Sequence, residues 1–284
     1  MDATGPNAEQ ITYWNEKSGP KWVAEQARLD GMIAPFGTRT MEVLGLKDGE
    51  HVVDVGCGCG GTALEIGRRV TARGSVLGVD ISEPMLARAR ERAVAEHLAH
   101  VRFVAADVQT HPFATNAADA IFSRFGVMFF ADPAAAFTNL HATLRPGGRL
   151  AFACWQPATE NAWIMVPVMA AASVVPLKPP PPPDAPGPFS FGDRDRVSGI
   201  LARAGFRDVA FEAFSPDIVV AGRGGVDEVV PFVMRLGPLS AVIEELEPDG
   251  VARVAAALRD AIAPYEDARG VVMASAAWIV TARR

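Results

Sequence analysis

Cysteine is scarce in this 284-residue sequence: Cys57, Cys59 and Cys154 are an odd number and too few for a disulfide framework. Apolar runs are also short. The longest, residues 163–175 and 271–280, fall below the about 20 residues that span a bilayer. The first residues, MDATGPNAEQ, lack the apolar segment of a secretory signal. We therefore expect a soluble protein of the cytoplasm with no membrane span.

A basic surface is missing as well. The net charge is −6, and the arginines lie scattered on predicted helix faces without interleaved aromatic residues. We therefore expect no nucleic-acid partner. Cys57 and Cys59 have no second pair of Cys or His at ligand spacing, so no metal site is predicted. Hydrophobic residues make up 49% and charged residues 21% of the chain, as in ordinary globular proteins.

What the sequence does contain is a regular alternation of strands and helices between residues 51 and 155. Apolar runs predict five strands, at 52–55, 75–79, 101–105, 119–123 and 149–155. Amphipathic patterns predict three helices among them, at 62–70, 83–98 and 133–144, the last stopped by Pro146-Gly147-Gly148. Such alternation requires parallel strands with right-handed crossovers. We predict an α/β fold of the Rossmann-like, doubly wound kind.

The segments around this core are also predominantly helical. Residues 1–46 are predicted to form a helical N-terminal segment, with helices at 9–16, 20–29 and 32–46. Its large aromatic residues either cap the edge of the sheet or, if a helix lies over the glycine turn of the core, form a lid on cofactor or substrate. Residues 47–155 are the predicted core, and residues 156–192 an insertion with a proline-rich loop at 178–183. That loop is interpreted as a surface connector, with a ligand for SH3-type modules as the alternative.

The last segment, residues 193–284, completes the predicted sheet. A helix at 193–204 precedes a strand at 208–214, and a strand at 274–284 ends the chain. Between these strands, residues 222–263 are predicted to form a helical cap insertion. The whole is a mostly parallel, seven-stranded sheet.

Glycines gather in His51–Gly61, HVVDVGCGCGG, between the first strand and the first core helix. Gly56, Gly58 and Gly61 satisfy GxGxxG, and a strand, a glycine turn and a helix N-terminus in that order form a cradle for a nucleoside cofactor. Asp80 ends the second strand, where an acid can accept hydrogen bonds from ribose hydroxyls. Enzymes that use NAD share these features, so the cofactor stays open at this point.

Five motifs in order resolve it: VVDVGCGCGG, GVDISEPML, VRFVAADVQTHPF, DAIFSRFGVMFFADP and NLHATLRPGGRLAFACW. They resemble the successive motifs of class I S-adenosylmethionine-dependent methyltransferases. They are most similar to the small-molecule group that contains the ubiquinone and menaquinone C-methyltransferases. The resemblance is strong over residues 40–155 and loose over the last two strands. It implies S-adenosylmethionine as cofactor.

The resemblance also implies where the cofactor binds. It assigns Asp54, Gly56, Cys57 and Gly58 to the methionine and ribose side. It assigns Asp80 to the ribose hydroxyls, Ile81 and Met85 to the adenine, and Asp107 to the adenine amino group, with Ala106 and Val108 beside it. Ser123, Arg124 and Phe125 are expected to flank the sulfonium. The alternatives are a turn-stabilising acid at Asp54 and simple strand-end caps at Asp80 and Asp107. Cys59 departs from the usual run of this loop, but its side chain is small.

The acceptor is expected to lie among residues that overhang the strand ends. The candidate substrate-binding residues are Tyr13, Trp14, Trp22, Met128, Phe129, Trp155, Asn161 and Trp163, of which about half are expected to be ordinary core. None of the five histidines is well placed as a base, so no catalytic residue is assigned. Catalysis by proximity and desolvation is favoured over a base from the cap, for which Glu228, Asp217 and Tyr265 are the candidates.

We therefore predict methyl transfer from S-adenosylmethionine to oxygen, carbon or nitrogen of a small, largely apolar acceptor, by in-line displacement. One alternative is a cofactor-binding relative without catalysis, acting as a regulatory or scaffold subunit. The other is an NAD-dependent oxidoreductase. A homodimer is left open.

Overall fold

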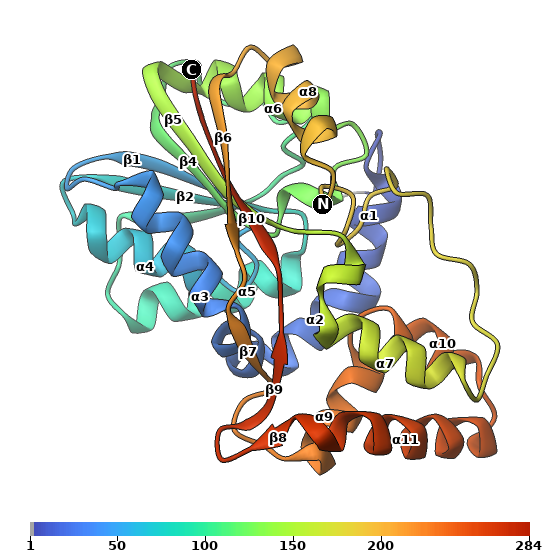
Figure 1. Ribbon diagram of the computed structural model, residues 1–284. Helices are drawn as coiled ribbons and strands as arrows, with labels where there is room; N and C mark the ends of the chain where they lie inside the picture. Colours follow the sequence, from blue (N-terminus) through green and yellow to red (C-terminus); the bar gives the residue numbers. More distant parts are fainter. Residues whose placement is uncertain (1–2) are drawn as a thin grey trace.

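The computed structural model describes residues 3–284 and confirms the predicted α/β fold (Figure 1). Seven strands form the main sheet in the order β3-β2-β1-β4-β5-β10-β6. They are β1 (His51–Val55), β2 (Ser75–Asp80), β3 (Val101–Ala105), β4 (Ala118–Arg124), β5 (Leu144–Trp155), β6 (Arg207–Phe214) and β10 (Ala277–Arg283). Strand β10 runs antiparallel to β5 and β6, and the other pairings are parallel.

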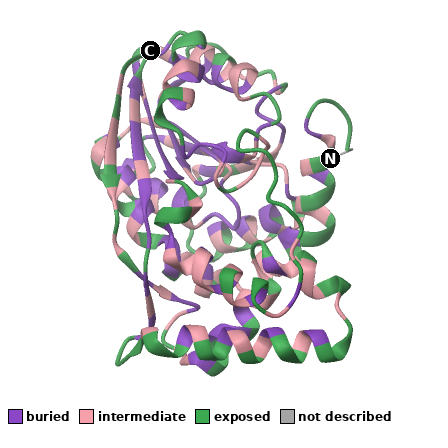
Figure 2. Cartoon of the chain, turned by 45° about the vertical axis from the view of Figure 1, so that its right-hand side comes forward, coloured by how far each residue is buried: buried purple, intermediate pink, exposed green. Residues whose placement is uncertain are grey.

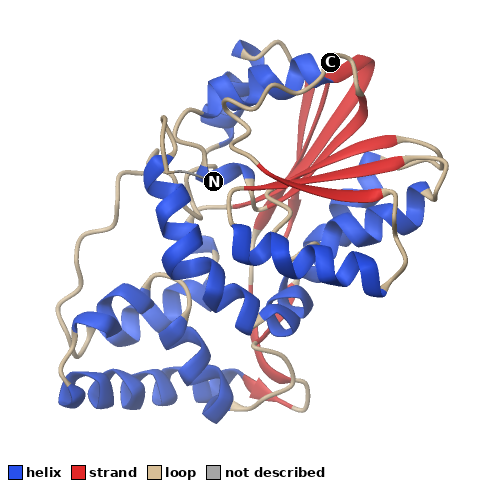
Figure 3. Cartoon of the chain, turned by 180° about the vertical axis from the view of Figure 1, so that it is seen from behind, coloured by secondary structure: helices blue, strands red, loops and turns tan. Residues whose placement is uncertain are grey.

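Helices cover both faces of this sheet, and the strands stay buried between them (Figures 2 and 3). On one face lie α3 (Gln26–Leu44), α4 (Gly61–Val70) and α5 (Glu83–Ala95), and on the other α6 (Pro133–Thr143) and α8 (Arg194–Arg203). Neighbouring residues of a strand point to opposite faces. Val52 accordingly packs with Leu64 and Ile66 of α4, whereas Val53 belongs to the core that includes Phe137 of α6.

The N-terminal segment is helical, as predicted, although its divisions differ from the predicted ones. It contains α1 (Ala8–Thr12), the π-helical turn η1 (Tyr13–Lys17) and α2 (Ser18–Ala24) before α3 begins at Gln26. The predicted break near residues 30–31 is wrong. Gly31 stays helical, because Leu29, Met32 and Ile33 on either side of it are buried in the core. Residues 1 and 2 of the predicted segment lie outside the described residues.

Strand β5 begins earlier than predicted, at Leu144 rather than residue 149. Leu144 pairs with Ala118 and Arg149 pairs with Ala120, so the Pro-Gly-Gly run forms a bulge within the strand. Helix α5 ends at Ala95, before the predicted residue 98, and His97 takes a left-handed conformation (φ +57°) just beyond it.

A second, three-stranded sheet was not predicted. It has the order β7-β9-β8, formed by β7 (Asp217–Val220), β8 (Glu266–Asp267) and β9 (Gly270–Ala274). The predicted strand at 274–284 therefore starts at Ala277. Ser275 is buried and donates a hydrogen bond to the carbonyl of Pro216 at 2.5 Å, which separates β9 from β10.

The cap helices lie beside this second sheet (Figure 1). They are α7 (Ala162–Ala172), α9 (Val226–Arg235), α10 (Leu239–Glu245) and α11 (Pro248–Ile262), and short 3-10 turns lie at η2 (Val127–Phe129), η3 (Ala158–Glu160) and η4 (Ala263–Tyr265). The proline-rich residues 178–183 lie in the exposed chain between α7 and α8. Within residues 3–284, no helix has both the length and the apolar character that crossing a membrane requires.

Strands β1 and β4 are neighbours in the sheet, although the chain visits β2 and β3 between them. Ligands of doubly wound sheets bind outside the carboxyl ends of the strands at such a switch point. Here the two backbones touch: a Cβ added to Gly56 would lie 2.5 Å from Gly126 Cα, and one added to Gly126 would lie 2.6 Å from the carbonyl oxygen of Val55. No side chain fits between the two strand ends.

Gly126→Ala should therefore lower the free energy of unfolding by about 1–3 kcal/mol, because the methyl group must displace backbone. For a chain of this size that is a fall in Tm of about 2–4 °C per kcal/mol. Gly31→Ala is the matched control, since its Cβ meets nothing within 4 Å and lies in a helix. Urea and thermal unfolding of both variants measure the difference. Equal stability would contradict the close contact.

Candidate functional site

The glycine turn begins where β1 ends. The N–H groups of Gly56 and Cys57 donate to the carbonyl of Val79 at 2.8 and 3.2 Å, which ties the turn to the end of β2. Gly58 has a positive φ of +54°, and a Cβ there would lie 2.8 Å from Cε of Met85. The positive φ at Gly58 favours glycine there, and a larger residue would also have to displace the end of the Met85 side chain.

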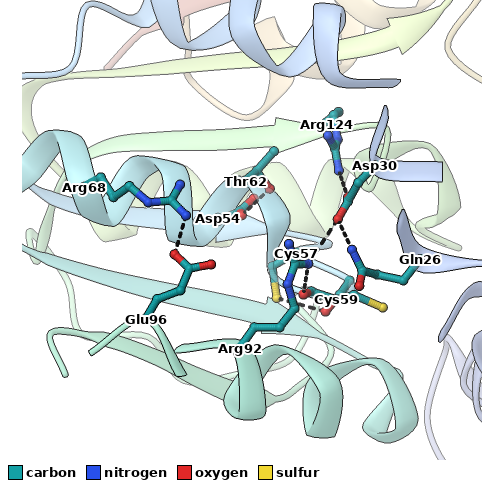
Figure 4. Close-up of polar contacts among 11 residues, drawn as sticks. Gln26, Asp30, Asp54, Cys57, Cys59, Thr62, Arg68, Arg92, Glu96 and Arg124 are labelled. Atoms are coloured by element: carbon teal, nitrogen blue, oxygen red, sulfur yellow. Dashed lines mark hydrogen bonds and ion pairs between the residues drawn. The ribbon is translucent and has the colours of Figure 1, made fainter. Parts of the chain in front are cut away.

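Asp54 lies fully buried directly before this turn. Its Oδ2 accepts a hydrogen bond from Thr62 at 2.7 Å, while its Oδ1 has no partner among the described residues (Figure 4). Burial raises the pKa of Asp54 to about 7, although the Thr62 hydroxyl and the positive charge of Arg124 oppose the rise. A buried acceptor without a partner costs free energy unless a ligand fills it. Thr62 alone therefore does not account for this acid.

Asp80, at the end of β2, binds the glycine turn and the next turn together. Its Oδ2 accepts from the N–H of Gly58 at 2.8 Å and its Oδ1 from the N–H of Ser82 at 2.9 Å. Burial raises the pKa of Asp80, and these backbone hydrogen bonds oppose the rise. A carboxylate oxygen has two lone pairs, so both oxygens can accept one further hydrogen bond from a pair of hydroxyls.

Asp107 follows β3 and is buried between Ala106 and Val108, which are buried as well. Both of its oxygens accept from the Gln109 side chain, at 3.0 and 2.9 Å, and Oδ1 also accepts from the Gln109 backbone. Gln109 was not singled out as a candidate from the sequence. The only available signal for its pairing with Asp107 was the separation of two residues between them. A contact of Asp107 with adenine stays a prediction.

The end of β4 carries the three residues predicted to flank the sulfonium. Ser123 is buried; its hydroxyl donates to the Val55 carbonyl at 2.7 Å and accepts from the N–H of Gly126 at 3.2 Å, so it joins β4 to β1. Phe125 has a positive φ of +64° and stacks on Trp155 at 4.0 Å. Arg124 extends instead toward α3, where its Nη2 donates to Asp30 at 3.1 Å.

Asp30 was not recognised in the sequence, and it is the centre of a cluster at the glycine turn (Figure 4). Its carboxylate accepts from Gln26 at 2.5 Å, Arg92 at 3.0 Å and Arg124 at 3.1 Å. Arg92 also donates to the carbonyl of Cys59 at 2.7 Å. The available signal was the Gln26–Asp30 spacing of four, which puts both polar side chains on one helix face.

The N-terminal segment lies over the end of β2. Asn15 donates to the carbonyl of Ile81 at 2.8 Å and accepts from the N–H of Glu83 at 3.0 Å. The hydroxyl of Ser82 donates to the carbonyl of Trp14 at 2.8 Å. Of the two interpretations of this segment, these contacts favour a lid. Asn15 itself was not singled out in the sequence.

The aromatic residues among the predicted acceptor contacts form two groups, one around Trp14 in the N-terminal segment and one at the end of β5. Trp14 meets Phe129 at 5.1 Å and Trp22 at 5.8 Å between ring centroids, and Trp155 meets Trp163 at 5.1 Å. Tyr13 is exposed, Met128 and Trp155 are buried, and Trp14, Trp22, Phe129 and Trp163 are half-buried. The half-buried rings at the carboxyl edge offer an apolar surface to a ligand.

Asn161 is different, because its amide is used inside the protein. It is fully buried, donates to the carbonyls of Gln156, Pro157 and Ala276, and accepts from the N–H of Ala276 and from Trp163. These bonds join β5, α7 and the turn before β10, and they occupy both ends of the amide. Asn161 therefore has a structural role in this state of the protein.

The candidate bases are mostly engaged elsewhere. His51, at the start of β1, bonds to Ser75, and His100, just before β3, bonds to the carbonyl of Gly67, both at the amino edge of the sheet. Burial lowers the pKa of His141, which lies on α6. In the cap, Glu228 bonds to Arg28 of α3 at 2.9 Å. That ion pair joins the lid to the cap.

The three cysteines are buried free thiols. Burial raises the pKa of Cys59 to about 12 and the pKa of Cys57 well above its ordinary value. Both are therefore neutral thiols rather than the thiolates that bind metals.

A protein-family model described as "Methyltransferase domain" matches residues 52–148, the segment that contains the glycine turn, Asp80 and Asp107. Over 194 residues the chain is 28% identical to the ubiquinone/menaquinone biosynthesis C-methyltransferase UbiE of Azotobacter vinelandii, covering 65% of this chain and 77% of UbiE. Residues 52–148 therefore match a methyltransferase domain, and the chain is similar to S-adenosylmethionine-dependent methyltransferases of small molecules.

The chain is similar to two further proteins. It is 35% identical over 138 residues to phosphoethanolamine N-methyltransferase 1 of Triticum aestivum, but the match covers 46% of this chain and only 27% of that protein. Its fold is similar to that of Haemonchus contortus phosphoethanolamine N-methyltransferase 2 in complex with S-adenosyl-L-methionine. The TM-score is 0.54 at 18% identity, over 87% of this chain and 52% of that chain.

The residues of the methyltransferase fit this cofactor. The free oxygen of Asp54 is a buried acceptor for a cationic group, and the remaining lone pairs of Asp80 suit two ribose hydroxyls. Between them lies the glycine turn, which leads into the N-terminus of α4, where backbone N–H groups suit the polar groups of a ligand.

The pKa of Asp54 makes cofactor binding pH-dependent. Because that pKa is raised to about 7, the carboxyl is neutral at lower pH and attracts the ammonium group of the ligand only when ionised. Affinity for S-adenosylhomocysteine should fall about tenfold from pH 8 to pH 6. Asp54→Asn should bind weakly and without this dependence. Calorimetry at both pH values measures it, and a flat wild-type profile would contradict the assignment.

Asp80→Ala should weaken S-adenosylhomocysteine binding at least about tenfold, because each hydrogen bond to a charged group contributes about 1.5–3 kcal/mol. Circular dichroism should show the fold retained. Glu83→Ala is the control, since exposed Glu83 lies at the same turn but pairs with Arg90. If calorimetry gives Asp80→Ala the wild-type affinity, the ribose assignment is wrong.

Proposed function

We propose that the methyltransferase transfers the methyl group of S-adenosylmethionine to oxygen, carbon or nitrogen of a small, largely apolar acceptor. The observation that carries the acceptor class is the set of half-buried rings, with Trp14 in contact with Trp22 and with Phe129, which follows β4, and Trp163 against Trp155 at the end of β5. Aromatic walls with few polar groups bind planar or lipophilic molecules. The relative that acts in ubiquinone and menaquinone biosynthesis supports the same class.

The cofactor, when bound, supplies a sulfonium whose methyl group is activated for in-line displacement. The protein's contribution is then alignment and the exclusion of water. Asp54 would hold the amino-acid end of the cofactor and Asp80 its ribose hydroxyls against the glycine turn, and Phe125 and Trp155 would limit the space behind it. The lid, joined to Ser82 and Glu83, would cover the reacting atoms.

A general base does not enter this mechanism. The histidines discussed above are engaged at the amino edge or on α6, and Glu228 is tied to Arg28. We therefore propose that the acceptor arrives with its nucleophilic atom already deprotonated or uncharged. The rate of methyl transfer should therefore depend on pH through the pKa of the acceptor and through the pKa of Asp54.

We also propose that the reaction takes place in the cytoplasm, in keeping with three unpaired, buried thiols. The acceptor reaches the site as a free small molecule in this proposal. A homodimer is not required by it, because the site is formed by residues of a single chain.

Ligand binding and turnover test the proposal in two steps. S-adenosylhomocysteine at 100 times its Kd should stabilise the protein by about 2.7 kcal/mol, while NAD should leave Tm unchanged. A shift with NAD alone would favour the oxidoreductase. Isotope-labelled S-adenosylmethionine is then incubated with a panel of phenols, quinones and apolar amines. Binding without transfer across the panel would favour the non-catalytic relative.

A further inference from the structure

The Asp30 carboxylate is held by donors from three different elements. Gln26 belongs to its own helix α3, Arg92 to α5 and Arg124 to the end of β4. The side chains of Arg92 and Arg124 are only 21% and 13% exposed. Ion pairs with this little solvent, and with several hydrogen bonds, fix geometry far better than exposed pairs.

The same carboxylate lies against the first residue of α4. A Cβ added to Gly61 would lie 2.7 Å from Asp30 Oδ1, so only glycine leaves room for the acid. The N-terminus of α4 has no side-chain cap of its own. A carboxylate at this position is stabilised by the helix dipole. Asp30 therefore packs against the last glycine of the turn, and Arg92 and Arg124 both donate hydrogen bonds to it.

Arg124 keeps most of its donors free. Its Nη2 bonds to Asp30, while its Nε and Nη1 bond to no protein oxygen within residues 3–284. Its aliphatic stem is confined by α3, since a Cβ added to Gly37 would lie 3.2 Å from its Cδ. Nearby, Asp54 has the free oxygen described above, and the positive charge of Arg124 acts on it. The Cβ added to Gly37 would also lie 3.4 Å from Cγ2 of Thr62, whose hydroxyl bonds to Asp54, so Arg124 and the free carboxyl oxygen belong to one neighbourhood.

A zwitterionic amino acid matches this pairing of charges. We propose that Asp30 is a positioning residue for the amino-acid end of the cofactor: it orients Arg124 to receive the carboxylate, while Asp54 receives the ammonium group. The proposal rests on the proposed cofactor site. It adds a residue of the lid helix to that site, so the lid and the methionine end of the cofactor are coupled.

The contribution of Asp30 decides whether its removal should weaken or strengthen ligand binding. It occupies one donor group of Arg124 and leaves the others, so it does not compete with a ligand carboxylate for them. Without it, a long side chain regains its rotamer freedom, and the two arginines lose their shared partner. Its negative charge also favours the positive sulfonium of S-adenosylmethionine, an effect that the uncharged thioether of S-adenosylhomocysteine does not share. Loss of the charge should therefore weaken binding.

The test uses two ligands that share the adenosine but differ in the amino-acid end: S-adenosylhomocysteine and 5′-methylthioadenosine. In calorimetry, Asp30→Asn should weaken S-adenosylhomocysteine about tenfold and leave 5′-methylthioadenosine within about twofold of wild type. In turnover, KM for S-adenosylmethionine should rise while kcat changes little. Asp30→Glu should not restore affinity, because the longer acid does not fit against Gly61.

Two further variants act as controls. Glu42→Gln removes a charge from the same helix, but Glu42 is exposed and pairs with Arg39 away from the site, so both ligands should bind as in wild type. Asn15→Ala removes the hydrogen bonds to the backbones of Ile81 and Glu83 on the adenosine side, so it should weaken the binding of both ligands alike.

Equal weakening of both ligands by Asp30→Asn would overturn the proposal and leave Asp30 a purely structural part of the lid. Unchanged or tighter binding of S-adenosylhomocysteine would overturn it as well. Failure of the proposed cofactor site looks different, because the wild-type protein itself would then bind neither ligand. Failure of methyl transfer alone would leave the binding of both ligands by the wild-type protein intact.

Discussion

The contact between the backbones of Gly56 and Gly126 is the constraint on which the site depends. It brings the ends of β1 and β4 together without any side chain between them, and Ser123 then bonds across the joint to Val55. Because of this approach, Asp54 is buried before the turn, and Arg124 and Phe125 emerge immediately beside it. A sheet of the same strand order with bulkier residues here would separate these groups.

The buried Asp54 and the N-terminal segment are both parts of the same candidate site. Because Asp54 is buried, its pKa is raised and its Oδ1 has no hydrogen-bond partner among the described residues. A cationic ligand would compensate for both effects. The N-terminal segment is tied down at two places, by Asn15 to the turn after β2 and by Asp30 to the arginines. The N-terminal segment is therefore fixed to the glycine turn and to the end of β4, and through Arg28 and Glu228 to α9.

Much of the fold followed from periodicity. The five core strands, their order of appearance and the flanking helices are set by apolar patterns that hold over several residues, and these were predicted within a few positions. The small sheet was missed because β7 and β9 are short and the run 271–280 has no local signal for a break at Ser275. The break is made by a hydrogen bond to Pro216, which is distant in sequence.

The site shows the same division. The glycine turn, Asp54, Asp80 and Asp107 were identifiable because each stands at the end of a predicted strand, where parallel topology places ligands. Asp30, Asn15 and Gln109 were not, because a polar residue on a helix or in a loop looks solvent-exposed in sequence. Their roles depend on partners many residues away, such as Arg124 for Asp30 and Ile81 for Asn15. The sequence by itself determined the strand ends and the cofactor cradle, since local pattern and turn chemistry suffice for these. Only the tertiary structure decided what covers the cradle, because that depends on charges and backbone groups that meet through folding alone.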